Sequence, residues 1–194
     1  MFHVEQTQFV VDLIDQLSTF GIKLNSEQAS ACSIYCDELL RWNDKVNLTS
    51  IVDKREITIK HFVDSFACVR ALKQVSESTL LDAGSGAGFP GLPLKIIQPD
   101  LTVTLLEPNG KKTAFLRHVI GTLNLKKISV VSKTLNEFVK AIKDSERFTH
   151  VVTRAVATEE ILPLATSLLS PGGYVILCRT KPFDMDAAPY GLTL

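Results

Sequence analysis

LLDAGSGAGFPG, residues 80–91, is the most informative segment of this 194-residue chain. An apolar run ends at Asp82, and Gly84, Gly86 and Gly88 follow at alternate positions. Glycine adopts backbone conformations that other residues avoid, and it lets a ligand come close to the main chain. Because open α/β sheets bind ligands beyond the carboxyl ends of their strands, the segment predicts a strand followed by a ligand-binding loop. An ordinary turn between a strand and a helix is the alternative for the loop considered alone.

An acidic residue ends the next expected strand, LTVTLLE (101–107). At that position the carboxylate of Glu107 can accept hydrogen bonds from both ribose hydroxyls of an adenosyl group. A solvated carboxylate at a strand end is the alternative. Loop and acid together predict an adenosine-containing ligand. They separate S-adenosylmethionine (SAM) from NAD only weakly, although the G-x-G-x-G spacing differs from the G-x-G-x-x-G of dinucleotide-binding enzymes.

Short apolar runs alternate with amphipathic stretches from residue 79 onward. The expected strands are TLLDA (79–83), LTVTLLE (101–107), ISVVS (128–132), THVVTRA (149–155) and GYVILC (173–178). Stretches with helical periodicity lie between them. This alternation is typical of an α/β fold with a mainly parallel sheet and helices on both faces. The PGG at 171–173 is expected to be a helix stop and a turn before the fifth strand.

The first 75 residues have a helical pattern instead. Gly21 is expected to end a first helix, in which apolar residues recur with the helical period at Val10, Leu13, Ile14, Leu17 and Phe20. Asn25 and Gln28 resemble a capping box that opens a second helix running to about Trp42. A third helical stretch is expected around residues 56–72. We therefore expect an N-terminal helical region (1–75) and a ligand-binding domain (76–194) that form one continuous structural unit.

Composition makes several protein classes improbable. Lys+Arg and Asp+Glu both number 21, so any contact with nucleic acid has to come from local patches. No apolar run approaches the roughly 18 residues that a membrane-spanning helix needs, and the acidic start of the chain makes a poor signal peptide. The four cysteines form no CxxC pair. We therefore expect no metal site, and reduced thiols that pack inside a cytoplasmic protein.

Four segments carry a more specific pattern: RWNDKVNLTS (41–50), HFVDSF (61–66), DAGSGAGFPGLPLKI (82–96) and TRAVA (153–157). They resemble, in this order, the W-N-x-x-x-N-L-T signature, the H-x-x-D-S segment, the cofactor loop and the S/T-R-A segment of one family. That family is the bacterial 16S rRNA (guanine-N7)-methyltransferases of the RsmG/GidB type. The resemblance covers about residues 9–178. It implies a Rossmann-like class I SAM-dependent methyltransferase preceded by N-terminal helices.

The resemblance also implies which residues surround SAM, in addition to Glu107. Gly84 matches the first loop glycine of the family and Phe89 the bulky residue that closes the loop, and both are SAM contacts in the family. Leu135 and Asn136 match the positions that hold the adenine end. The family often has an acid at the second of these, but the amide oxygen of Asn136 can still meet the adenine amino group. Arg154 matches an arginine beside the cofactor, with a strand-end ion pair as the alternative.

Other residues in the matching region have a structural interpretation beside a functional one. Trp42 and Phe62 are expected to pack in the core rather than to stack on bases. His61 is expected to be a structural hydrogen-bond partner rather than a catalyst. The polar residues that either order a loop or touch RNA are Asn43, Asn47 and Thr49. The cations that form either a solvated helix face or a phosphate contact are Lys111, Lys112 and Arg117.

The activity that this resemblance implies is methyl transfer from SAM to N7 of guanine 527 in 16S rRNA. The expected partner is 16S rRNA or the 30S subunit, and a monomer is favoured. Guanine N7 carries a free lone pair, so the reaction needs no general base, and we assign no catalytic residue. Proximity and electrostatic placement are expected to supply catalysis. The alternatives are methylation of another RNA or a small molecule, SAM binding without catalysis, and the less favoured NAD-dependent oxidoreduction.

The end of the chain departs from the family pattern. Family members usually continue after the fifth strand with further strands and a helix, often starting with Lys-Gly. Here RTKPFDMDAAPYGLTL (179–194) follows, and its prolines and glycine predict coil. We therefore expect an incomplete set of C-terminal strands and an exposed sheet edge after the fifth strand.

Overall fold

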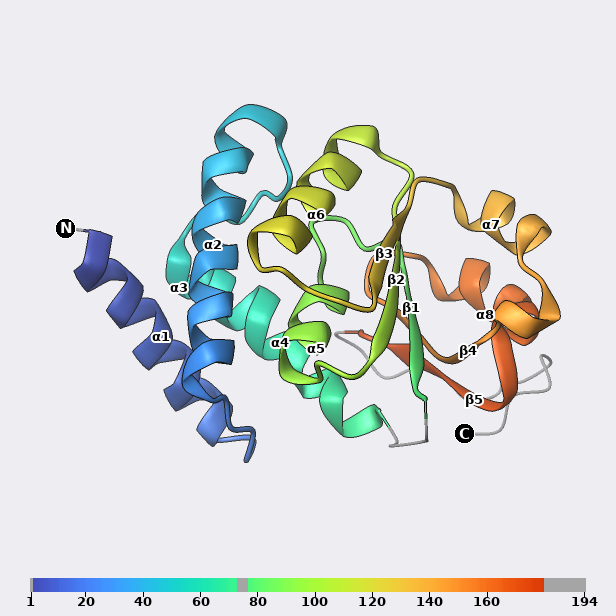
Figure 1. Ribbon diagram of the computed structural model, residues 1–194, viewed down its shortest axis with the longest axis horizontal. Helices are drawn as coiled ribbons and strands as arrows, with labels where there is room; N and C mark the ends of the chain where they lie inside the picture. The colour runs from blue at the N-terminus through green and yellow to red at the C-terminus, as the bar shows by residue number, and fades with distance from the viewer. Residues whose placement is uncertain (1, 73–76, 180–194) are drawn as a thin grey trace.

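A computed structural model of the chain describes residues 2–72 and 77–179. Its sheet has five strands in the order β3-β2-β1-β4-β5, and each neighbouring pair is parallel (Figure 1). The strands are β1 (Thr79–Ala83), β2 (Thr102–Leu106), β3 (Ile128–Val131), β4 (Phe148–Thr153) and β5 (Leu169–Leu177). The expected parallel α/β fold is confirmed. Within the described residues, no helix is long and apolar enough to cross a membrane.

Helices cover both faces of the sheet. On one side lie α5 (Gly91–Ile97) and α6 (Gly110–Thr122), and on the other lie α7 (Leu135–Ala141) and α8 (Thr158–Leu168) (Figure 1). A short 3-10 helix, η3 (Asp144–Glu146), precedes β4. Successive strand residues enter different apolar clusters, because side chains alternate across a sheet. Thus Leu80 packs in the cluster beneath α5 and α6, and Leu81 in the cluster beneath α7 and α8.

The fifth strand corrects one sequence prediction. The PGG at 171–173 lies inside β5 and not in a turn before it. Phe148 pairs with Leu169, and His150 pairs with Tyr174. An advance of two residues along β4 therefore corresponds to five residues along β5, so β5 contains an irregular bulge. Gly172 has a φ of +77°, which explains why a strand can contain this kink. The expectation of coil after Cys178 falls on residues 180–194, outside the described part of the chain.

The N-terminal region contains the expected helices. They are α1 (Phe2–Ser18), α2 (Ser26–Val46), α3 (Lys54–Ile57), the π-helix η1 (Thr58–Val63), α4 (Asp64–Ala67) and the 3-10 helix η2 (Cys68–Ala71). The capping box is confirmed, since Gln28 N donates to Asn25 Oδ1 and Asn25 N donates to Gln28 Oε1. The second helix continues to Val46, past the predicted end. Gly21, with a φ of +67°, follows α1 as expected.

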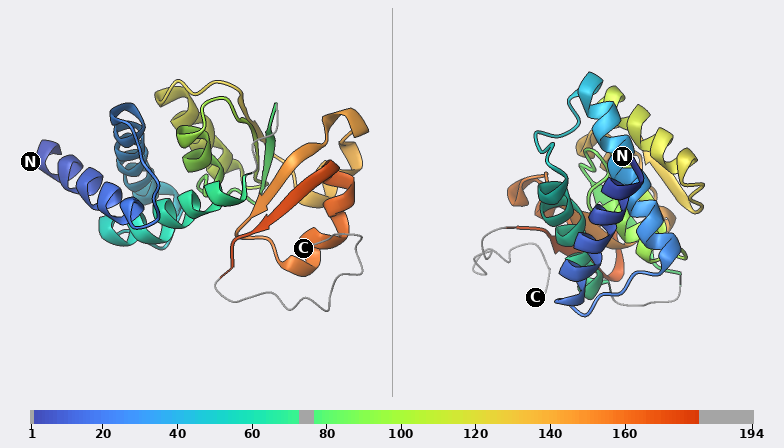
Figure 2. Two further views of the ribbon diagram at one scale, coloured as in Figure 1. Left: turned by 90° about the horizontal axis from the view of Figure 1, so that it is seen from below. Right: turned by 90° about the vertical axis from the view of Figure 1, so that its left-hand side faces the viewer.

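The apolar stripe of α1 is narrower than its sequence pattern indicates. Leu13 and Leu17 are buried, but Ile14 is 42% exposed and Phe20 39% exposed. Figure 2 shows why only one side of α1 is covered. The helix forms the outermost layer of the molecule and rests on α2, which in turn packs against α5 and α6.

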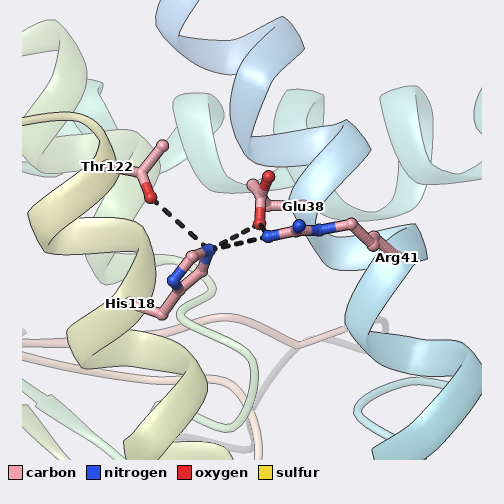
Figure 3. Close-up of polar contacts among 4 residues, drawn as sticks. All are labelled: Glu38, Arg41, His118 and Thr122. Atoms are coloured by element: carbon pink, nitrogen blue, oxygen red, sulfur yellow. Dashed lines mark hydrogen bonds and ion pairs between the residues drawn. The ribbon is translucent and has the colours of Figure 1, made fainter.

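A polar cluster joins α2 to α6. The Glu38 carboxylate of α2 contacts both Arg41 and Nε2 of His118 on α6 (Figure 3). Thr122 Oγ1 lies 3.4 Å from the same imidazole nitrogen. Trp42 packs beside this cluster, with its ring centroid 5.1 Å from that of His118. This packing role, and the complete burial of Phe62, agree with the structural interpretation of both aromatic residues.

An aromatic stack connects the N-terminal helices to the glycine loop. The Phe89 ring is stacked on Tyr35 of α2 and on His61 of η1, with centroid distances of 4.9 and 4.6 Å. Phe62 meets Phe89 edge to face at 5.3 Å. Residues from both regions therefore share one apolar cluster, which includes Leu13, Leu39, Phe66, Leu92 and Leu116.

His61 makes polar contacts from both ring nitrogens. Arg154 Nη2 lies 3.2 Å from Nδ1, and Thr49 Oγ1 lies 3.0 Å from Nε2. An arginine can only donate, so Nδ1 accepts and Nε2 carries the proton that is donated to Thr49. Burial, reinforced by the charge of Arg154, lowers the pKa of His61 to about 4. The imidazole is therefore neutral at physiological pH, as a structural hydrogen-bond partner requires.

We expect His61 to make the fold sensitive to mild acid. Its native pKa lies below the ordinary value of about 6.5, so the unfolded chain binds the proton more tightly. The stabilisation is present above about pH 6.5 and is lost as the pH falls towards about 4. The non-titrating variant His61→Gln is therefore expected to lose less of its melting temperature than the native chain between about pH 7 and about pH 4.5.

Circular dichroism melts of both proteins in this range measure the difference. Carboxylates such as Asp82 titrate in both proteins, so the difference between the two pH profiles isolates His61. Parallel profiles would contradict the neutral, buried imidazole.

Candidate cofactor and substrate site

The glycine loop turns sharply at the carboxyl end of β1. Gly84, Gly86 and Gly88 have φ angles of +74°, +58° and +102°, in the region that side-chain-bearing residues rarely adopt. The amides of Gly84 and Ser85 donate to the carbonyl of Leu106, at 2.9 and 3.0 Å. These bonds hold the loop against the end of β2.

The glycines of the loop have different surroundings. A Cβ on Gly88 would lie 2.4 Å from Leu92 Cδ1 and 2.7 Å from the Tyr35 hydroxyl, so Gly88 allows the loop to pack closely against α2. A Cβ on Gly86 would meet only the Gly84 carbonyl, at 4.0 Å. The loop is therefore open at Gly86, where a ligand can approach the backbone.

Glu107 reaches the tip of this loop from the end of β2. Gly86 N donates to its Oε2 at 2.9 Å, and Asn109 N donates to its Oε1 at 2.9 Å. The residue is only 6% exposed, which contradicts the alternative of a solvated carboxylate. Each carboxylate oxygen accepts one bond in this arrangement and keeps capacity for another. Two ribose hydroxyls can therefore be accommodated beside the loop.

Asp82 is a second buried acid, which the sequence analysis did not include among the site residues. Gly91 N donates to its Oδ2 at 2.8 Å, whereas its Oδ1 has no hydrogen-bond partner among the described residues. Burial raises the pKa of Asp82 to about 7, against the opposing effects of the Gly91 hydrogen bond and the charge of Arg154. A cationic ligand nearby would favour the ionised form. An acid that ends an apolar strand is the sequence signal that could have identified it.

Phe89 and Arg154 lie together on the other side of the loop. The Phe89 side chain is 3% exposed and belongs to the aromatic stack, so it faces the N-terminal helices. The guanidinium carbon of Arg154 lies 5.5 Å from the Phe89 ring centroid, and its Nη1 donates to Lys60 O at 2.9 Å. Within residues 2–72 and 77–179, no ion pair joins Arg154 to a carboxylate. A simple strand-end ion pair therefore does not describe it.

Leu135 and Asn136 lie farther along the same edge of the sheet. They begin α7, whose capping box pairs Thr134 with Glu137. Leu135 is half-buried in the second apolar cluster, and Asn136 is exposed. Glu107 N donates to Val131 O at 3.1 Å, which places the end of β3 beside the acid. No direct contact joins this pair to the loop in the described residues.

The four family-like segments meet around this edge. Asn43 Oδ1 accepts hydrogen bonds from the amides of Leu48 and Thr49, so it orders the loop after α2. Thr49 then contacts His61, and His61 contacts Arg154 and Phe89. Segments 41–50, 61–66, 82–96 and 153–157 are therefore parts of one hydrogen-bonded and stacked assembly.

A pocket of about 510 Å³ opens beside Arg154, between α4 and the end of β5. Its lining residues are Asp64, Ala67, Cys68, Ala71, Arg154, Ile176, Leu177, Cys178 and Arg179. The pocket lies next to the loop because Arg154 borders both.

The four cysteines of the chain are free thiols, and three are buried.

These features fit SAM. The open backbone at Gly86 admits a ligand, the free capacity of Glu107 suits ribose hydroxyls, and two buried acids offset the positive sulfonium. The expected groups on the loop, on β2 and on β4 converge at one sheet edge, where open α/β sheets bind ligands. Among the described residues, no cluster of three or more His, Cys, Asp or Glu could hold a metal ion.

Comparison with solved structures shows the same fold in methyltransferases. The chain matches a structure of coclaurine N-methyltransferase bound to N-methylheliamine and SAH with a TM-score of 0.53 at 16% identity, covering 91% of this chain and 57% of that one. A putative caffeoyl-CoA O-methyltransferase from Staphylococcus aureus matches with a TM-score of 0.52 at 16% identity, covering 73% and 65%. At such identities the likeness concerns the fold alone.

Sequence comparison is more specific. Proteins named ribosomal RNA small subunit methyltransferase G match at 41% identity in Lachnoclostridium phytofermentans, over 92% of this chain and 75% of that protein. In Roseiflexus castenholzii the identity is 43%, over 75% of this chain and 62% of that protein. The model of the family described as rRNA small subunit methyltransferase G matches residues 28–187. The chain therefore belongs to the rRNA small subunit methyltransferase G (GidB) family.

Proposed function

We propose that this protein transfers the methyl group of SAM to N7 of a guanine in 16S rRNA of the small ribosomal subunit. By resemblance to the family, the target is guanine 527. The observation that carries the proposal is the pairing of the Glu107 carboxylate with Gly86 N at the open side of the loop. That arrangement suits the adenosyl ribose, and family membership selects SAM and rRNA among its possible users.

Residues of the loop, β2, α7 and the end of β4 are proposed to surround SAM. Gly84 and its neighbours present their backbone to the methionine part, and Glu107 accepts from the ribose hydroxyls. Leu135 and Asn136 border the adenine, with the Asn136 carbonyl oxygen accepting from the adenine amino group. Arg154 lies beside the methionine end. Because the Phe89 ring is buried, its contribution is to brace the loop, with contact made through its backbone.

The chemistry requires positioning rather than proton transfer. The N7 lone pair forms a bond to the methyl carbon, and the carbon–sulfur bond breaks with its electrons going to sulfur. The purine becomes cationic and no proton moves, so neutral His61 has no role as a base. What the chain supplies is a fixed geometry, through the braced loop, and acidic groups near the developing charge.

We further propose that residues 1–75 and 76–194 act as one unit, as a monomer in the cytoplasm. The shared apolar cluster supports the single unit, since it contains residues from both regions. The remaining alternatives are methylation of another RNA or a small molecule, and SAM binding without catalysis. The matches of the segments at 41–50 and 61–66 to one rRNA methyltransferase family favour 16S rRNA.

A methyl-transfer assay tests this proposal. The protein is incubated with methyl-labelled SAM and 30S subunits, or free 16S rRNA, from cells that lack the modification. We expect label at N7 of a single guanine, at position 527. Intact SAM binding without N7-methylguanine would refute the function while leaving the fold. Label in another RNA would favour the first alternative.

Substitution of Gly84 tests the cofactor loop. Gly84→Val places a Cβ 2.9 Å from Val156 Cγ2, at a φ of +74° that a β-branched residue resists. The strain must displace the loop, so SAM affinity is expected to fall at least about tenfold, as about 1.4 kcal/mol does. Isothermal titration calorimetry measures the change.

The matched control is Gly121→Ala on α6, where the added Cβ meets no atom within 4 Å. Alanine favours a helix, so SAM affinity and folding are expected to stay unchanged. Native-like SAM affinity in folded Gly84→Val would refute the placement of the cofactor on this loop.

A further inference from the structure

The pocket beside Arg154 has the position of an acceptor site. It lies at the carboxyl ends of β4 and β5, on the same sheet edge as the glycine loop. Its volume of about 510 Å³ is in the range of small-molecule sites. Arg154 lines the pocket and also contacts Phe89 of the loop, so a base in the pocket can lie between the loop and α4.

Asp64 stands on the α4 side of this pocket. It is the first residue of α4 and directly follows η1, the π-helix that contains His61. The described residues provide no hydrogen-bond partner for its carboxylate, although that carboxylate borders the pocket. Partial burial raises the pKa of Asp64, and the charge of Arg154 opposes this effect. Asp64 is exposed, so its carboxylate is free to accept hydrogen bonds from a ligand in the pocket.

Guanine has the complementary edge. Its N1–H and N2–H donors are adjacent, and a carboxylate can accept both at once, whereas adenine, cytosine and uracil lack this pair. O6 and N7 follow around the ring. Arg154 uses two of its five N–H donors, on Lys60 O and His61 Nδ1, and keeps others for O6. The three protein groups around the pocket are therefore proposed to follow the atoms around the guanine ring. Asp64 faces N1 and N2, Arg154 faces O6, and the loop with its cofactor faces N7.

We propose that Asp64 is the specificity-determining residue that holds the N1–H and N2–H edge of the acceptor guanine. This inference rests on the proposed function and adds how the site recognises its base. Methylation at N7 places positive charge on the purine, which makes N1–H and N2–H stronger donors. The hydrogen bonds to the Asp64 carboxylate are then stronger in the transition state than in the ground state. Asp64 therefore increases the rate of methyl transfer as well as selecting guanine over other bases.

Replacing the acceptor guanosine by inosine tests this proposal, because inosine lacks only the N2 amino group. Reconstituted 30S subunits carry either nucleoside at the methylated position, and kcat/KM is measured for the native chain, Asp64→Ala and Asp64→Asn. The native chain is expected to lose roughly 10- to 100-fold on inosine, the effect of one charged hydrogen bond. Asp64→Ala is expected to be slow on both substrates and to discriminate between them by less than about threefold.

The controls separate recognition from structure. Asp15→Asn makes the same chemical change as Asp64→Asn on an exposed position of α1, and native discrimination is expected. SAM affinity is expected to be unchanged in all variants, which a folding defect would alter. Undiminished discrimination in Asp64→Ala and Asp64→Asn would overturn the assignment of Asp64. Absence of N7 methylation by the native chain on guanosine would overturn the proposed function and this inference with it.

Discussion

The imidazole ring of His61 lies between Phe89, Thr49 and Arg154, and each contact joins a different part of the chain. The three partners come from the cofactor loop, from the segment after α2 and from the end of β4. Only a neutral ring can accept from Arg154 and donate to Thr49 at the same time. The position of the loop relative to the N-terminal helices therefore depends on an uncharged histidine in a largely buried site.

This junction explains why residues far apart in sequence form one site. The stack on Phe89 holds the loop from one side, while bonds to Leu106 O and from Gly86 N to Glu107 hold it from the other. Arg154 is fixed by Lys60 O and His61, and it also lines the pocket beside Asp64. Arg154 is thus shared by the glycine loop and the proposed acceptor pocket, an arrangement that suits methyl transfer by positioning.

The sequence predicted the features that depend on local pattern. Strand alternation, the Asn25 capping box and the glycine loop each arise from neighbours in the chain, so periodicity and turn chemistry suffice to predict them. Features that arise from distant packing were missed. The PGG segment lies in a bulge inside β5 because Leu169 before it and Tyr174 after it both pair with β4. Phe89 is buried because Tyr35 and His61 stack on it. Likewise, the pocket at Asp64 exists only because α4 and the end of β5, which are far apart in the sequence, lie next to each other.

Nitrogen-15 NMR of the histidine rings measures the state of His61 directly. We expect His61 to be neutral at about pH 6, below the ordinary histidine pKa of about 6.5, with the proton on Nε2 and Nδ1 as an acceptor. Addition of SAM should leave this state unchanged, because the junction exists before the cofactor binds. A protonated imidazolium at that pH, or a proton on Nδ1, would show that His61 does not join the loop to Arg154 and Thr49 as a neutral ring.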